Sequence, residues 1–125
     1  MRYAVLIYQD ERLWAQATAE ERAGFHAAHT AFDKAVTESS ATTVGGEALV
    51  GVANATTLRY DDQDRCTMTD GPFAETAEQL GGFYLLDAPD LDVVTGLCAL
   101  LPHQYSIEVR PVADMSQASD WLDAN

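Results

Sequence analysis

Two stretches of this chain are apolar on both sides of the β-strand that each would form. In residues 2–9, RYAVLIYQ, alternate side chains point to opposite faces of a strand, and both sets are largely apolar. Residues 83–86, FYLL, have the same character. Strands that are apolar on both faces are typical of sheets covered on both sides. The two segments therefore predict central strands of a sheet whose two faces are both buried.

Two amphipathic segments provide the cover for one face of such a sheet. Thr18 starts a capping-box pattern, and the apolar period of a helix then continues to about Glu38. A second helix is expected after Asp90 or Asp92, either of which can act as its N-cap, and it ends at Pro102. The inward stripe of the first helix consists of Phe25, His29, Phe32 and Val36.

The remaining segments complete an alternating order of strands and helices. Residues 42–50 contain a glycine pair and indicate a broken or bulged strand. Residues 54–60 and 65–69 flank an acidic turn, as the strands of a β-hairpin do, and residues 105–112 indicate a last strand. The order β-α-β-β(-β)-loop-β-α-β predicts an α+β fold, the ferredoxin-like split βαβ sandwich.

In such a sandwich both helices lie on one face of the sheet and leave the other face bare. Because the predicted strands are apolar on that face as well, it forms an exposed apolar patch, which indicates a partner surface. The simplest partner is a second copy of the chain, in a two-fold homodimer whose sheet faces pack together.

The charge balance excludes some classes of partner. The chain has 20 Asp and Glu against 7 Lys and Arg, a formal net charge of −13, and one lysine, Lys34. Nucleic acids demand positive charge on a protein, so direct nucleic-acid binding is not expected. The sequence has no run of 18 apolar residues and no signal-peptide pattern. We therefore expect no membrane contact and a cytoplasmic protein.

The sequence contains no motif for a metal or a cofactor. Cys66 and Cys98 lie far apart, without a CxxC motif or a Cys/His cluster, so we expect two reduced, buried cysteines and no zinc site. The chain also lacks a dinucleotide-binding glycine loop, a Walker loop, and the HExxH and GxSxG patterns. No cofactor and no metal are expected.

His29 and Asp70 are the candidate catalytic pair. An imidazole against an apolar wall has a pKa that its neighbours can move across neutrality, which suits a general acid or base. Alternatively, His29 is a core histidine satisfied by a backbone carbonyl or a tyrosine hydroxyl. Asp70 precedes Gly71-Pro72, which holds its side chain at the end of a strand. Its carboxylate can fix the tautomer of His29, organise an Asx-turn at this corner, or do both.

The polar loop that precedes FYLL supplies further candidate ligand-binding residues. Glu75 and Thr76 either rim a pocket over His29 or belong to a solvated loop. Gly82 would permit the close approach of a ligand. Tyr8 is expected near the same pocket from the predicted fold.

The run TDGPFAETAEQLGGFYLLD resembles the signature of DGPF-domain proteins within the YCII-related family. The segments MRYAVLIYQDE, HAAHTAFDKAV and IEVRPV are similar to the same family in the same order. The resemblance covers residues 1–112 and leaves residues 113–125 as a C-terminal extension, in which a helical turn or two is expected around Met115 and Trp121. It implies a dimeric α/β-barrel of two ferredoxin-like subunits, with a His and Asp pair in a pocket that matches the pair named above.

Two functions from different classes follow. The first is a cofactor-independent small-molecule site at which His29, oriented by Asp70, moves a proton on a ring or carbonyl substrate. The resemblance adds that some relatives act on chlorinated or hydroxylated aromatic rings. The alternative is a non-catalytic binding or regulatory module that meets an extracytoplasmic-function sigma factor through its acidic surface, since many members of the resembled family are encoded beside such factors.

Overall fold

Strand β1 (Arg2–Gln9) lies inside the main sheet, with antiparallel neighbours β5 (Gln79–Asp87) and β6 (Ser106–Pro111) on its two sides. Strand β2 (Thr42–Ala48) pairs antiparallel with the other edge of β5, so the strand order is β2-β5-β1-β6. This computed structural model describes residues 1–116. The fold is α+β and consistent with the ferredoxin-like arrangement that the sequence predicts.

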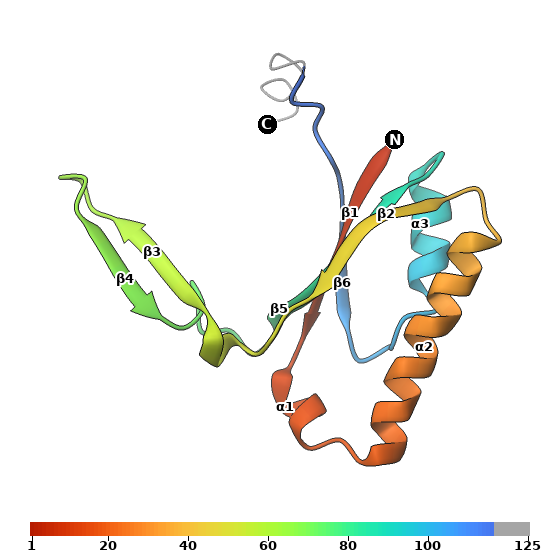
Figure 1. The fold of residues 1–125 in the computed structure, drawn as a ribbon, viewed down its shortest axis with the longest axis horizontal. Helices are drawn as coiled ribbons and strands as arrows, with labels where there is room; N and C mark the ends of the chain where they lie inside the picture. Colours follow the sequence, from red (N-terminus) through yellow and green to blue (C-terminus); the bar gives the residue numbers. More distant parts are fainter. Residues whose placement is uncertain (117–125) are drawn as a thin grey trace.

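Two helices, α2 (Ala19–Thr37) and α3 (Leu91–Cys98), cover one face of this sheet (Figure 1). Helix α2 begins with the predicted capping box. The Thr18 hydroxyl accepts the backbone N–H of Glu21 at 3.1 Å, and the Glu21 carboxylate accepts the backbone N–H of Thr18 at 3.2 Å. Of the two predicted caps of α3, Asp90 is the one used, and its carboxylate accepts a backbone N–H of the first turn at 3.0 Å.

The core lies between these helices and the inner face of the sheet. Of the stripe predicted on α2, Phe25, Phe32 and Val36 are buried and His29 is half-buried. Full burial of a large apolar side chain stabilises a fold by about 1.5–3 kcal/mol, so this stripe fixes α2 on the sheet. The other fully buried core side chains are Val5, Leu86, Val94 and Leu101.

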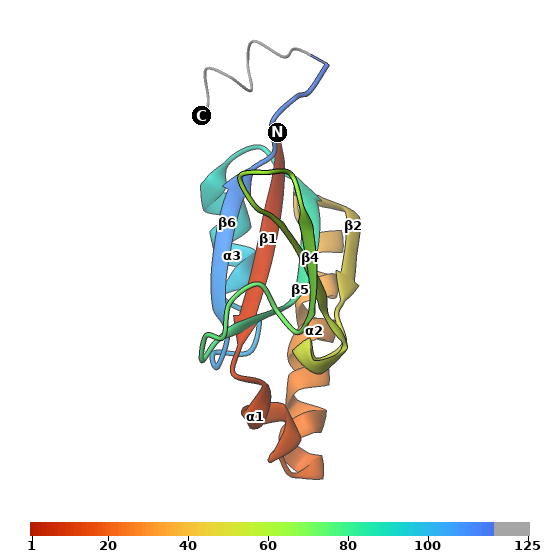
Figure 2. The ribbon, with the colours of Figure 1, turned by 90° about the vertical axis from the view of Figure 1, so that its left-hand side faces the viewer.

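The outer face of the main sheet is not covered by a described helix (Figures 1 and 2). Side chains alternate along β1, so Ala4, Leu6 and Tyr8 point away from the core and stay partly exposed. Leu85 pairs with Ala4, and Phe83 with Leu6, across the β1–β5 ladder. The bare apolar face expected from the sequence is therefore present in the single chain, and residues 1–116 form no closed barrel.

The hairpin predicted around the acidic turn stands apart from the main sheet. Its strands, β3 (Thr56–Tyr60) and β4 (Cys66–Asp70), follow the short 3-10 helix η1 (Val52–Asn54) and form a separate two-stranded sheet. In Figures 1 and 2 this hairpin projects in front of the outer face of the main sheet. We call residues 56–70 the arm.

The position of the arm explains why one of the two cysteine predictions was wrong. Cys98, in α3, is buried as expected, and burial raises the pKa of its thiol to about 11. Cys66, the first residue of β4, was expected to be buried but is exposed, because no element of the described chain packs over the arm. Both cysteines are free.

Strand β2 has the irregularity that its glycine pair predicts. Its register with β5 shifts between Thr43 and Gly45. Gly46 has a φ of +154°, and a Cβ at this position would lie 2.7 Å from the carbonyl oxygen of Phe83. Only glycine combines this backbone conformation with so close an approach of the two strands.

The C-terminal helical turns expected around Met115 and Trp121 fall largely on residues 117–125, which lie outside the described residues. Within residues 1–116, no helix has both the length and the apolar character needed to cross a membrane. Helix α2 has 19 residues, but its exposed face carries charged side chains such as Glu20 and Lys34.

Candidate functional site

A pocket opens on the helix side of the main sheet, beside the first turns of α2. Its volume is about 800 Å³, within the range of about 300–1,000 Å³ that is usual for small-molecule sites. Its walls are α1 (Glu11–Ala15), α2, the inner face of β1 and β5, and residues 46–51. The aromatic residues and histidines that line it are Trp14, Phe25, His26, His29, Phe83, Tyr84 and Tyr105.

His29 is held between two tyrosine hydroxyls in this pocket. Its Nδ1 lies 2.6 Å from the hydroxyl oxygen of Tyr84 in β5, and its Nε2 lies 2.9 Å from the hydroxyl oxygen of Tyr105, just before β6. A histidine satisfied by a tyrosine hydroxyl was one of the alternatives that the sequence left open. The structure adds a second tyrosine on the other ring nitrogen.

The helix period and the strand alternation bring these three side chains together. His29 lies on the inward stripe of α2, between Phe25 and Phe32. The Phe32 ring packs against the Tyr84 ring with centroids 4.6 Å apart, and the Phe25 ring stacks on the Tyr105 ring at 6.0 Å. The apolar neighbours of His29 on the stripe therefore hold the two tyrosines that bind it.

Burial sets the protonation states of the three groups. Desolvation lowers the pKa of His29, the Asp33 carboxylate opposes this shift, and His26 adds to it. Desolvation raises the pKa of Tyr84 to about 12 and also raises the pKa of Tyr105. At neutral pH the site therefore holds a neutral imidazole between two neutral phenols.

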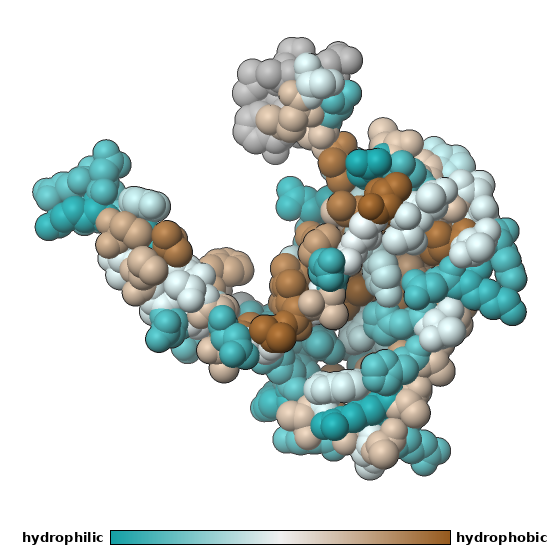
Figure 3. Space-filling view, viewed as in Figure 1, coloured by the Kyte–Doolittle hydropathy of each residue, from teal (hydrophilic) through white to brown (hydrophobic). Residues whose placement is uncertain are grey.

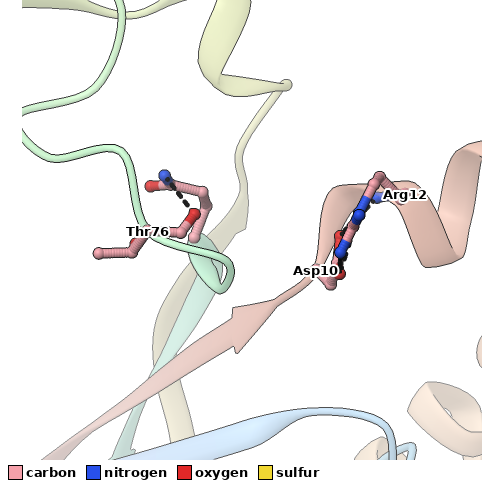
Figure 4. Close-up of polar contacts among 4 residues, drawn as sticks. Asp10, Arg12 and Thr76 are labelled. Atoms are coloured by element: carbon pink, nitrogen blue, oxygen red, sulfur yellow. Dashed lines mark hydrogen bonds and ion pairs between the residues drawn. The ribbon is translucent and has the colours of Figure 1, made fainter.

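Helix α1 closes one side of the pocket. The Asp10 carboxylate caps the helix by accepting the backbone N–H of Arg12 at 3.0 Å, and it pairs with the Arg12 guanidinium at 2.6 Å (Figure 4). The Trp14 ring packs against two aromatic rings of α2. The Glu11 carboxylate accepts the backbone N–H of Val52 at 2.8 Å, which ties α1 to the segment that follows β2.

The matches to known proteins cover the residues of all these elements. The family model of the YCII-related domain matches residues 1–116. The chain belongs to the YCII-related domain family. An uncharacterized protein from Rhizobium meliloti (strain 1021) is 40% identical over 118 residues, which cover 90% of this chain and 93% of that protein. The resemblance to the YCII-related family read from the sequence is confirmed.

This YCII-related chain brings together only some of its predicted site residues. His29 and Gly82 line the pocket. Asp70 ends β4 at the base of the arm, is exposed, and lies outside the pocket walls. Within the single chain, both ring nitrogens of His29 bind Tyr84 and Tyr105, so these tyrosines set its tautomer.

The other predicted ligand-binding residues do not line the pocket. Tyr8 lies on the outer face of the sheet, where its hydroxyl donates to the Glu108 carboxylate at 3.2 Å. Glu75 and Thr76 are exposed in the segment between β4 and β5. The Thr76 hydroxyl donates to the carbonyl oxygen of Glu78 at 2.6 Å. The Thr76 carbonyl oxygen accepts an N–H of the Gln79 side chain at 3.1 Å (Figure 4).

Gly82 has a role in sheet packing as well as a place in the pocket. A Cβ at this position would lie 2.9 Å from the carbonyl oxygen of Glu47 in β2. The close approach expected at this glycine is thus made by the neighbouring strand.

Sequence reasoning missed Tyr84 and Tyr105 as partners of His29, and Glu11 and Trp14 as pocket walls. A signal for Tyr105 was present, because strand alternation predicts that it faces inward. A hydroxyl in an apolar inward row needs a polar partner when it is buried. His29 is the polar member of the stripe that faces this row.

Lowering the pH should destabilise this YCII-related chain through His29. Its pKa in the folded chain is lowered, and the unfolded value is about 6.5. Between these values the unfolded state binds more protons, so the free energy of unfolding decreases as the pH falls. Between about pH 7 and about pH 5.5, the free energy of unfolding measured in urea should decrease more in the wild type than in His29→Gln. His103→Gln, at an exposed histidine, should behave as wild type. Equal losses in wild type and His29→Gln would contradict the prediction.

Proposed function

We propose that the pocket binds a small molecule and that Tyr84, His29 and Tyr105 act on it as a proton relay. The observation that carries this proposal is the hydrogen-bonded row of the three side chains, with contacts of 2.6 and 2.9 Å. It supports the proton-transfer chemistry on a ring or carbonyl substrate that the sequence predicts. The two tyrosines take the orienting role that sequence reasoning gave to Asp70.

The row has a direction that depends on the tautomer of His29. A neutral imidazole donates from one nitrogen and accepts at the other. The tyrosine that receives the ring N–H keeps its own O–H free to donate. The other tyrosine donates to the ring and keeps lone pairs free to accept. The row therefore offers the pocket one hydrogen-bond donor and one acceptor.

This donor and acceptor can move a proton between two atoms of one ligand. An acidic C–H or O–H of the ligand loses its proton to the accepting tyrosine oxygen, while that tyrosine passes its own proton to His29. The ring N–H proton moves to the second tyrosine, whose O–H proton passes to a carbonyl oxygen of the ligand. The ligand is tautomerised, His29 changes its tautomer, and the chain keeps its charge.

The walls of the pocket favour an uncharged ring compound. Trp14 and Phe25 offer flat apolar contacts, and the relay offers polar contacts at the inner wall. The charged side chains among the described residues that line the pocket are Glu11 and Glu47, with no Lys or Arg. These carboxylates disfavour a phosphate or carboxylate ligand. An enolisable cyclic ketone or a phenol meets these demands.

Hydrogen exchange on the ligand tests the proposal. The wild-type protein is incubated in D2O with a panel of uncharged phenols and cyclic ketones, and NMR follows the replacement of C–H by C–D. The relay predicts exchange above the buffer rate for at least one compound, and a thermal shift reports binding separately. A thermal shift without exchange would refute the relay, and the absence of both across the panel would refute the small-molecule site.

We also propose that two chains pair through the outer faces of their main sheets as a dimeric α/β-barrel. The partly exposed side chains of Leu6, Phe83 and Leu85, on a face without a described helix, support this arrangement. Tyr8 lies on the same face and would meet the second copy. A molar mass in solution equal to that of one chain, at high protein concentration, would refute it.

A further inference from the structure

The two faces of the arm differ in chemistry. Residues directly opposite each other in β3 and β4 share a face, and successive pairs alternate between the two faces. One face has two apolar pairs and a polar pair at the base of the arm, whereas the other carries threonines and an arginine. We call Leu58, Tyr60, Cys66 and Met68 the apolar face; Thr56 and Asp70 form the polar pair at its base. The polar face consists of Thr57, Arg59, Thr67 and Thr69.

The apolar face of the arm is exposed in the single chain. Leu58 is 51% exposed, Tyr60 66% and Met68 69%. A lone two-stranded hairpin is marginally stable in water and needs a further strand, a helix or another surface against its apolar face. Within residues 1–116 the arm strands have no such neighbour, and Figures 1 and 3 show the arm extending away from the rest of the chain.

Hydrogen bonds close the base of the arm. Gly71 has a φ of +115° and donates its N–H to the carbonyl oxygen of Ala55 at 2.7 Å. The Thr57 hydroxyl donates to the carbonyl oxygen of Gly71 at 2.8 Å. The Arg59 guanidinium donates to the carbonyl oxygen of Phe73. The exposed face therefore belongs to a hairpin whose two strands are joined at the base by side-chain and backbone hydrogen bonds.

We propose that the apolar face of the arm packs on a second copy of the chain and acts as the clasp of the dimer. This inference rests on the dimer proposed above. The arm projects on the side of the bare outer face of the main sheet, so both apolar surfaces of one chain face the same neighbour (Figures 1 and 2). A two-fold axis gives the two arms equivalent contacts on opposite subunits and closes the assembly at two copies.

Charge favours a second copy over a foreign basic protein. The net charge of −13 would draw a basic partner to the acidic surfaces. The four side chains of the apolar face are uncharged, and the charge on this side of the arm, Asp70, lies at its base. Two acidic chains can meet only where the contact is uncharged or complementary. Arg110 lies exposed on the outer sheet face, without a salt bridge to any residue in the described part of the chain. The acidic turn at residues 61–64, at the tip of a partner's arm, complements it.

Cys66 is a natural probe of this contact. It lies on the apolar face, and the other cysteine, Cys98, is buried with a raised thiol pKa, so reaction of the folded, reduced protein with iodoacetamide reports on Cys66. We expect alkylation to slow by at least about tenfold between protein concentrations at which light scattering gives a monomer and those at which it gives a dimer. Tenfold protection corresponds to about 1.4 kcal/mol for release of the arm.

The outcomes separate the clasp from the dimer itself. A dimer in which Cys66 reacts as fast as in the dilute monomer overturns the clasp and leaves the sheet-to-sheet dimer standing. A monomer at every concentration overturns both.

Substitutions on the two faces of the arm provide a second measurement. The Leu58→Ser/Met68→Ser double variant removes one apolar cross-strand pair and should speed Cys66 alkylation at concentrations where the wild type is dimeric. Thr67→Ser, on the polar face, is the control and should keep the wild-type rate. Unchanged protection in the double variant would argue that the apolar face makes no contact.

Discussion

We expect the Phe32→Ala variant to lose about 3–5 kcal/mol of its free energy of unfolding. Phe32 is fully buried near the middle of the α2 stripe, and its ring packs against Tyr84 at 4.6 Å. The loss combines the transfer free energy of the aromatic ring with the cavity that it leaves. Domains of this size have a total stability of only about 5–15 kcal/mol, so the variant should unfold at a much lower urea concentration.

An exposed apolar residue provides the control for this experiment. Leu91, at the start of α3, is 49% exposed, and Leu91→Ala should change the free energy of unfolding by no more than about 0.5 kcal/mol. Circular dichroism follows both variants in urea. If the midpoints of Phe32→Ala and Leu91→Ala coincide, the α2 stripe does not hold the helix on the sheet as described.

The second large effect concerns the relay. His29→Gln should slow ligand deuterium exchange by about 10²–10⁴-fold. The glutamine amide can hydrogen-bond to the two tyrosine hydroxyls, but it does not take up and release a proton near neutral pH. The substitution therefore cuts the relay while a polar side chain of similar reach stays in the pocket. The NMR exchange assay, run at matched ligand occupancy, measures the rate.

Matched variants distinguish the relay from a general effect on folding. His103→Gln makes the same change at an exposed histidine outside the pocket, where Nε2 lies 3.0 Å from the carbonyl oxygen of Ala99, and it should exchange at the wild-type rate. Tyr84→Phe and Tyr105→Phe each remove one hydroxyl and should each slow exchange. Adding either tyrosine substitution to His29→Gln should slow exchange little further, because the three side chains act as a unit. Wild-type exchange in His29→Gln would exclude the relay.

The main sheet could be predicted because its signals are local. The capping box at Thr18 and the two-sided apolar strands can be read from short windows, and one helix stripe on one sheet face leaves few arrangements. The hairpin of the arm was predicted from its turn, but its separation from the sheet was not. A turn motif predicts which two strands pair, but it does not predict which part of the protein the pair packs against. Cys66 was misplaced for the same reason.

The candidate site could be predicted only in part. His29 was found because the helical period directs it at the sheet. Asp70 was chosen as its partner from a rigid corner in the sequence, yet the groups that meet His29 depend on the register of distant strands. Tyr84 and Tyr105 lie 55 and 76 positions along the chain from His29. Strand alternation shows which way such residues face, and the topology decides what they touch.

The arm lies within the connection between β2 and β5, two strands that are neighbours in the main sheet. Its residues can change in sequence or number without altering the register of that sheet, and no described residue of the pocket wall belongs to it. If the arm is the clasp, natural selection can alter which subunits associate while the chemistry of the pocket is preserved. After a gene duplication, the two encoded proteins can then diverge until each forms its own homodimer and they no longer exchange subunits.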